Sequence, residues 1–176
     1  MQNFLPLVYL IFLLGVLSFF FLTIIRQILQ RQNAEKDLYD LKKKVQTNQA
    51  DYIDYYLLGT LYLSKKLFDQ AILQFRYALK LWDKEDNNGL TTLYNTLGFT
   101  YFKLEQYELA IYYYKESLKK TKDYIVALNN LGYAYEKQKM LPEAIEIYKE
   151  TIKYDKSNNI AKDRVKIISR RLGNSG

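Results

Sequence analysis

Hydrophobic residues follow two different patterns along this chain. Residues 4–25 form a run of 22 residues without a charged side chain. A helix rises 1.5 Å per residue, so this run would be about 33 Å long, enough to cross the hydrocarbon core of a bilayer. From residue 52 onward, apolar residues instead recur at helical spacing among polar ones. The first pattern predicts a transmembrane anchor, and the second predicts amphipathic helices that pack on one another.

The apolar run has the features of a retained anchor rather than a cleaved signal peptide. No Lys or Arg precedes it, it is longer than a signal-peptide core, and no small-x-small cleavage site follows it. We therefore expect an anchor over residues 4–25 and a charged helical stalk over residues 26–51. Because basic residues follow the run, the positive-inside rule predicts that the C-terminal bulk lies on the cytoplasmic side or its organellar equivalent.

The stalk offers two interpretations of its basic residues. They either contact anionic lipid headgroups or form an ordinary solvated helix surface. Leu38, Leu41 and Val45 add a narrow apolar stripe, so the helix is expected to run on beyond the anchor. The membrane-proximal basic residues are Arg26, Arg31, Lys42, Lys43 and Lys44.

A pattern of small and aromatic residues occurs three times between residues 52 and 155. In each copy, Leu precedes a Gly, Tyr follows that Gly by three positions, and Ala follows it by twelve. An aromatic residue stands four positions after the Ala, and a small residue follows three positions later. The glycines and alanines of the three copies are Gly59, Ala71, Gly98, Ala110, Gly132 and Ala144.

This pattern predicts pairs of helices that cross closely where the Gly and the Ala meet. One pair cannot cover its own apolar faces, so the pairs must stack, and three is about the minimum for stability. We expect repeat units at residues 52–85, 91–124 and 125–158. Residues 83–89 should form a polar loop, because Asn87, Asn88 and Gly89 disfavour a helix. This loop holds a five-residue insertion, which is either a tolerated surface insertion or a partner contact.

The last segment predicts a capping helix over residues 159–172. Ala161, Val165, Ile168 and Leu172 form one apolar face, and basic residues dominate the other. One side should cover the last repeat while the other faces water.

Composition removes several kinds of chemistry. The chain contains no Cys and no His, which excludes disulfides, thiol nucleophiles, zinc fingers and imidazole triads. It has no glycine-rich phosphate loop, so we predict no catalytic residues, no cofactor and no metal site. The net charge of +7 permits binding to phosphates or anionic lipid, although solubilising lysines explain it more simply. The basic residues are scattered outside the capping helix, which makes nucleic-acid binding an unlikely function.

The repeated residues are those of the tetratricopeptide repeat, and the sequence resembles this family over residues 52 to about 158. It departs from the pattern in lacking the proline that often closes a repeat and the Trp early in the first helix. The resemblance implies an all-α fold. We expect a single N-terminal transmembrane helix, a right-handed α-solenoid of three helix pairs, and a C-terminal capping helix.

In such a solenoid the first helix of each pair lines the concave side. The residues just after the core positions should form a groove of aromatic and apolar groups with two amides, which suits an extended peptide or a helix. Glu136 takes the position of Leu63 and Phe102 in the third copy. The alternative is that the stalk or the C-terminal helix fills the groove. The expected partner-binding residues are Tyr56, Thr60, Leu63, Asn95, Phe99, Phe102, Asn129 and Tyr133.

The groove differs from the two-carboxylate clamp with which some members of the family hold chaperone C-termini. Tyr56 and Thr60 stand at the corresponding places, and we find no Lys or Arg opposite them. Docking of that type is therefore not expected.

The layout as a whole resembles a family of small plastid-encoded and cyanobacterial, membrane-anchored tetratricopeptide proteins associated with photosystem I assembly or stability. The resemblance rests on a single span that opens with LPLVYL at residues 5–10, a short charged stalk, three repeats and a basic end. Abundant Tyr, Lys, Ile, Leu and Asn are typical of an AT-rich genome such as that of a plastid. The resemblance implies a thylakoid anchor with a lumenal N-terminus and stromal repeats. If the protein is not from a plastid, we expect the anchor to lie in an inner or cytoplasmic membrane and the repeats to be cytoplasmic.

Three functions follow as hypotheses. The first is a membrane-tethered assembly or stability factor that binds photosystem I subunits or assembly factors, its tether raising the effective concentration of partners on one surface. The second is a generic membrane-anchored scaffold or import receptor in a bacterium or another organelle. The third is a basic nucleic-acid or ribosome-docking module, which a steep salt dependence would distinguish.

Overall fold

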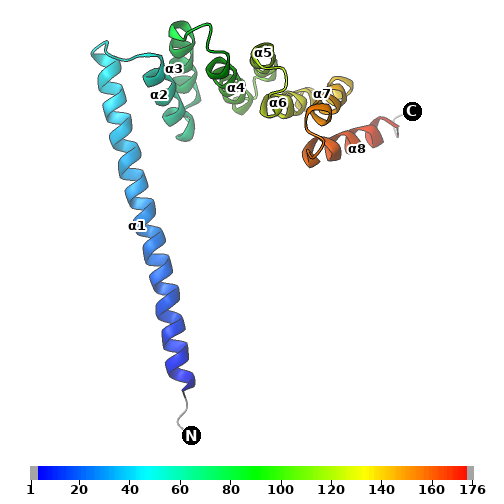
Figure 1. Ribbon diagram of the computed structural model, residues 1–176. Helices are drawn as coiled ribbons and strands as arrows, with labels where there is room; N and C mark the ends of the chain where they lie inside the picture. Colours follow the sequence, from blue (N-terminus) through cyan, green and yellow to red (C-terminus); the bar gives the residue numbers. More distant parts are fainter. Residues whose placement is uncertain (1–3, 174–176) are drawn as a thin grey trace.

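The computed structural model describes residues 4–173, and within that range the chain is entirely helical, with eight α-helices and no strand (Figure 1). A long first helix, three helix pairs and a last helix follow one another, and each packs on its neighbours in the chain, as in a solenoid. This confirms the predicted fold class. The helices are α1 (Leu5–Gln46), α2 (Tyr52–Ser64), α3 (Phe68–Leu81), α4 (Asn87–Lys103), α5 (Tyr107–Lys120), α6 (Ile125–Lys137), α7 (Leu141–Tyr154) and α8 (Asn159–Gly173).

The apolar part of α1 extends away from the repeats (Figure 1). None of its most apolar 18-residue window is buried, and within residues 4–173 it is the one helix long and apolar enough to cross a membrane. Pro6 lies in its first turn, where a missing N–H costs little. The helix continues without a break past the apolar run, so residues 26–46 of the expected stalk are the second half of the same helix, while residues 47–51 connect it to α2.

Four helices end in the same way, and the sequence pattern did not reveal it. Each is followed by a residue with a left-handed backbone, φ between 55° and 62°. Just after it, a backbone N–H donates to a carbonyl five residues back, as from Leu67 to Tyr62 at 2.9 Å. The chain therefore reverses direction after α1 as it does inside each repeat, which places α2 beside α1. The left-handed residues are Asn48, Lys66, Glu105 and Lys139.

The repeat glycines lie chiefly against aromatic rings, and at Gly98 the carbonyl oxygen of Ala110 would also lie 3.1 Å from an added Cβ, in line with the expected close approach of glycine and alanine. A Cβ on Gly59 would lie 2.5 Å from the ring of Phe75. In the other two repeats, the nearest atoms to the glycine likewise belong to the aromatic residue four positions after the alanine. The alanines are fully buried in the same core. The close crossing thus serves to bury a large ring, and burial of such rings stabilises the stacked pairs.

Helix α4 begins earlier than predicted. The expected loop over residues 83–89 ends at Asp86, and Asn87, Asn88 and Gly89 form the first turn of the helix. The carboxylate of Asp86 accepts hydrogen bonds from the N–H of Gly89 and from the indole N–H of Trp82, both at 2.9 Å. The bond from Gly89, followed by that from Trp82, lowers the pKa of Asp86 below its ordinary value of 3.8. An Asp that caps free backbone N–H groups outweighs the poor helix propensity of the three residues that follow.

Candidate functional site

The second half of α1 covers the first repeat. Leu38 and Leu41 are buried against Leu58 of α2, with Val45 and Leu61 packed beside them. The apolar stripe predicted for the stalk is therefore an interface. It gives the first repeat the neighbouring helix that a solenoid needs at each end.

Polar contacts complete this interface. Lys44 Nζ lies 2.7 Å from Asp54 Oδ1, and Glu35 forms a second ion pair with Lys65. Asp54 also closes a capping box with Asp51 at the start of α2. The hydrogen bond to Asp54 raises the pKa of Lys44 above its ordinary value. The ionised side chains thus fix the register between α1 and α2.

Two of the predicted membrane-proximal lysines bind the protein instead of standing free. Lys44 pairs with Asp54, and Lys42 Nζ lies 5.6 Å from the centre of the Tyr62 ring. Along a straight helix, Lys42 lies about 25 Å beyond Ile25. Arg26 and Arg31 are exposed and much nearer the apolar run, and Lys43 is exposed as well.

The structure brings four of the predicted groove residues together in two contacts. Leu63 and Phe99 line one cavity of about 450 Å³, together with Phe68, Lys66 and Lys103. The rings of Phe102 and Tyr133 lie 5.2 Å apart. Helices α2, α4 and α6 thus present a shared apolar surface, which we call the Phe99–Tyr133 surface. On this surface Phe99 is 36% exposed and Tyr133 is 42% exposed, so both rings are accessible to a partner.

Lysines flank both exposed rings, a feature that the sequence argument missed. Lys103 Nζ lies 5.1 Å from the centre of the Phe99 ring, and Lys137 Nζ lies 5.3 Å from that of Tyr133. Each lysine stands four residues after its ring, so helical spacing was the signal that would have found them. The surface therefore combines apolar rings with positive charge.

The other four predicted groove residues are placed differently. Tyr56 packs against Phe75 and Trp82, with ring centres 5.8 and 5.7 Å away, and so lies at the edge of the core. Thr60 lines a separate cleft between α1 and α2. The amide of Asn130 donates to Asn95 Oδ1 at 3.0 Å, while Oδ1 of Asn129 is buried and has no hydrogen-bond partner among the described residues.

Glu136 does not face an open groove. Its carboxylate accepts hydrogen bonds from Arg164 Nε at 2.7 Å and from the Tyr148 hydroxyl at 2.8 Å, and its side chain is 6% exposed. A second guanidinium N–H of Arg164 completes a two-point pair. The bond to Glu136 raises the pKa of Arg164, while burial, followed by the bond to Glu136, raises the pKa of Tyr148. Helix α8 thus ties down this carboxylate.

The terminal helices do not fill the Phe99–Tyr133 surface. Helix α1 packs on α2, and α8 packs on α7 with Ala161 and Ile168 fully buried. The described residues that line the cavity at Phe99 come from α2 to α4. No group of three or more acidic residues, His or Cys in the described part of the chain is arranged to hold a metal ion. The arrangement is suited to binding a protein segment through apolar contact and positive charge.

The fold and this surface define a class of protein. A sequence profile of the family described as tetratricopeptide repeat matches residues 53–123 and 90–157. The first tetratricopeptide domain of Spaghetti (RPAP3), solved with an HSP90 peptide bound, has the same fold, with a TM-score of 0.62 at 20% identity. That similarity covers 70% of this chain and 94% of the solved chain. This is a helical-repeat scaffold of the kind that binds other proteins.

Two relatives narrow the class to a particular family. The chain is 44% identical over 172 residues to the ycf37 protein of Guillardia theta, covering 98% of this chain and 97% of that protein. It is 32% identical over 166 residues to the chloroplastic tetratricopeptide repeat domain-containing protein PYG7 of Arabidopsis thaliana, covering 90% of this chain and 55% of PYG7. The chain belongs to the ycf37 family of tetratricopeptide-repeat proteins.

Proposed function

We propose that this chain is a membrane-tethered scaffold that supports the assembly or stability of photosystem I at the thylakoid membrane. The layout of anchor, stalk, repeats and basic end supports the assignment, as does its likeness to a chloroplastic relative. The N-terminus lies in the lumen and the repeats lie in the stroma. Arg26 and Arg31, which follow the apolar run directly, support this orientation.

The observation that carries the proposal is the continuity of α1. The same helix supplies the apolar run at one end and the buried contact with α2 at the other. Residues 26–37 separate these two parts by about 18 Å of helix. The repeats are therefore held at a set height above the membrane, and confinement to one surface raises the effective concentration of membrane partners.

The partner binds at the Phe99–Tyr133 surface. Exposed rings provide apolar anchors, and Lys103 and Lys137 beside them favour a segment that also carries acidic groups. Helical-repeat surfaces of this kind take extended peptides or helices. A photosystem I subunit or one of its assembly factors supplies this segment.

Truncating the two exposed rings tests this assignment. We expect Phe99→Ala combined with Tyr133→Ala to lower capture of photosystem I subunits by about tenfold or more, because both apolar anchors are lost. Tagged full-length protein in thylakoid membranes of the source organism is solubilised in mild detergent, and captured proteins are quantified by mass spectrometry. Far-ultraviolet circular dichroism should report unchanged helicity, since both rings are partly exposed.

A matched control truncates two exposed side chains on another helix. Leu109 and Tyr112 of α5 are 42% and 54% exposed, and their double alanine variant should capture photosystem I subunits as the wild type does. If the Phe99/Tyr133 variant captures photosystem I subunits as well as the wild type does, the binding site lies elsewhere. Capture of ribosomal proteins that wash off with moderate salt, without photosystem I subunits, would overturn the assembly role in favour of a basic docking module.

A further inference from the structure

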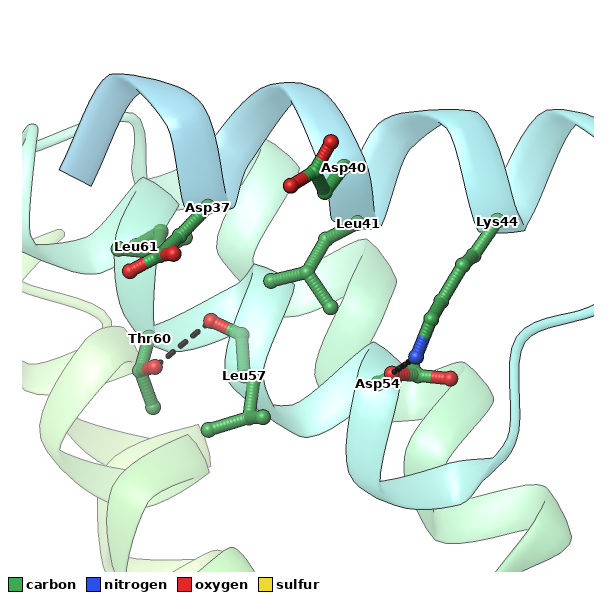
Figure 2. Close-up of a pocket in the computed structure, with 8 residues that line it drawn as sticks. All are labelled: Asp37, Asp40, Leu41, Lys44, Asp54, Leu57, Thr60 and Leu61. Carbon is green, nitrogen blue, oxygen red and sulfur yellow. Dashed lines mark hydrogen bonds and ion pairs between the residues drawn. The ribbon is translucent and has the colours of Figure 1, made fainter. Parts of the chain in front are cut away.

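An open cleft lies beside the packed contact between the second half of α1 and α2 (Figure 2). Its volume is about 440 Å³, and side chains of both helices line it. Leu41 of α1 points toward Leu57 of α2, and Leu61 extends the same apolar lining (Figure 2). Leu57 is 45% exposed although it lies beside a packed interface. An opening of this size with an apolar lining accommodates apolar side chains of a partner.

The charges that face the cleft are mostly negative. Lys44 and Asp54 neutralise each other at one end, where the lysine reaches across to the carboxylate (Figure 2). Asp37 and Asp40 also line the cleft and form no ion pair within residues 4–173. Helix α2 contains no Lys or Arg, and the lysines that neighbour Asp40 on α1, other than Lys44, do not line the cleft. The cleft therefore favours a cationic partner, in contrast to the net charge of +7 of the chain.

The position of the cleft narrows the choice of partner. Asp37 lies twelve residues beyond Ile25, which is about 18 Å along the helix. On the side of the membrane where the repeats lie, the segments next to transmembrane helices are rich in Lys and Arg. About six residues of extended chain span that distance. The basic flank of a neighbouring transmembrane helix therefore reaches the cleft.

We propose that the cleft between α1 and α2 binds the basic segment that flanks a transmembrane helix of a partner protein. An apolar side chain of that segment packs on Leu41 and Leu57, and its Lys or Arg pairs with Asp37 and Asp40. This inference rests on the proposed function, because it needs α1 to be inserted in a membrane with the repeats on the side where flanking segments are basic. It adds a second binding surface, of opposite charge to the Phe99–Tyr133 surface.

The test uses the full-length chain in nanodiscs of neutral phosphatidylcholine. The probe is a fluorescent leucine-rich transmembrane peptide with a short flank of Leu, Lys and Arg, and a matched peptide carries Gln in place of Lys and Arg. We expect Asp37→Asn combined with Asp40→Asn to weaken binding of the basic peptide about fivefold to tenfold, since two surface charge pairs are lost. Added salt should reduce the difference between the wild type and this variant.

A control variant separates local from overall charge. Asp123→Asn with Asp163→Asn removes the same charge at exposed positions outside the cleft and should bind as the wild type does. Leu57→Ser should weaken binding to a similar degree at all salt concentrations, because it removes apolar contact. Equal affinity of the Asp37/Asp40 variant and the wild type, or equal binding of the Gln peptide, would overturn the proposal.

Failure here is distinguishable from failure of the photosystem I assignment. If the basic peptide binds as expected but no photosystem I subunits are captured, the cleft proposal stands and the photosystem I assignment falls. If photosystem I subunits are captured but the basic peptide binds the Asp37/Asp40 variant as tightly as the wild type, the assignment stands and the cleft proposal falls.

Discussion

The two ends of the solenoid are closed in different ways. At the C-terminal end, Ala161 and Ile168 of α8 are fully buried, and Arg164 pairs with a carboxylate that is 6% exposed. At the N-terminal end, α1 contributes Leu38 and Leu41, and Lys44 pairs with Asp54 while its own side chain stays 52% exposed. Both ends therefore combine an apolar contact with ion pairs, but only the N-terminal contact lies beside an open cleft.

The difference follows from what each terminal helix must do. Helix α8 packs on the last repeat, where its Ala161 and Ile168 are fully buried. Helix α1 leaves the solenoid after one interface and continues into the apolar run, so it meets α2 along only part of its length (Figure 1). The result is a sealed end and an end with an accessible cleft. Binding sites gather where a scaffold leaves such surface uncovered.

The largest expected difference comes from placing a carboxylate in each apolar contact. Ile168→Asp should lower the free energy of unfolding by about 4 kcal/mol or more, because it places a charge at a fully buried apolar position. Leu41→Asp should cost about 2 kcal/mol, since its carboxylate can reach water through the cleft. Thermal unfolding of the two full-length variants, followed by circular dichroism, checks the order. A larger loss for Leu41→Asp would contradict the view that the C-terminal end is the sealed one.

A smaller effect should follow from breaking the buried ion pair at the C-terminal end. Arg164→Ala leaves Glu136 buried without its cation and should cost about 2 to 3 kcal/mol. Adding Glu136→Gln should restore part of this loss, because a neutral amide can still accept the hydrogen bond from Tyr148. Urea denaturation of the single and double variants measures the coupling. A double variant less stable than Arg164→Ala would show that charge burial is not the cause.

The smallest expected effect is a difference in pH dependence between the Lys44–Asp54 and Arg164–Glu136 ion pairs. The hydrogen bond to Asp54 raises the pKa of Lys44 above its ordinary 10.5, so its contribution is complete below 10.5 and is lost as pH rises through the raised value. The bond to Glu136 raises the pKa of Arg164 above its already high ordinary value, so that pair persists. We therefore expect the Tm difference between wild type and Lys44→Met to be constant up to about pH 9 and to shrink as the pH rises above about 10.5.

The corresponding difference for Arg164→Met should stay constant over the same range and serves as the control. Circular dichroism melts at a series of pH values provide the measurement. A Lys44→Met difference that does not change with pH would mean that its ion pair adds nothing to the N-terminal contact.

The helices of the repeats could be predicted closely from the sequence, because the residues that pack on one another within a repeat recur at fixed, short spacings. The Gly of each copy and the aromatic ring sixteen residues later lie within one helix pair, as with Gly132 and Tyr148. The start of α4 was predicted too late in the sequence. The capping carboxylate of Asp86 outweighs the low helix propensity of Asn87, Asn88 and Gly89.

Contacts between distant segments were harder to predict. Glu136 and Arg164 are 28 residues apart, and their pairing depends on how α8 is rotated against the last repeat. The apolar stripe of the stalk was visible, but which face of α2 it would cover was not. The placement of Thr60 in the cleft therefore could not be derived from its position in the repeat.

In the proposed function, one helix joins the membrane to the repeats without a hinge. The chain contains no Cys, so Ser18→Cys and Lys80→Cys place a pair of spin labels in the apolar run and on α3 without other labelling sites. Double electron–electron resonance on the full-length chain in nanodiscs then measures the distance between them. A single narrow distance that broadens when Leu38 and Leu41 are both changed to Asp is the predicted result. A broad or multiple distribution in the otherwise unchanged chain would show that α1 moves freely against the repeats and would contradict the account.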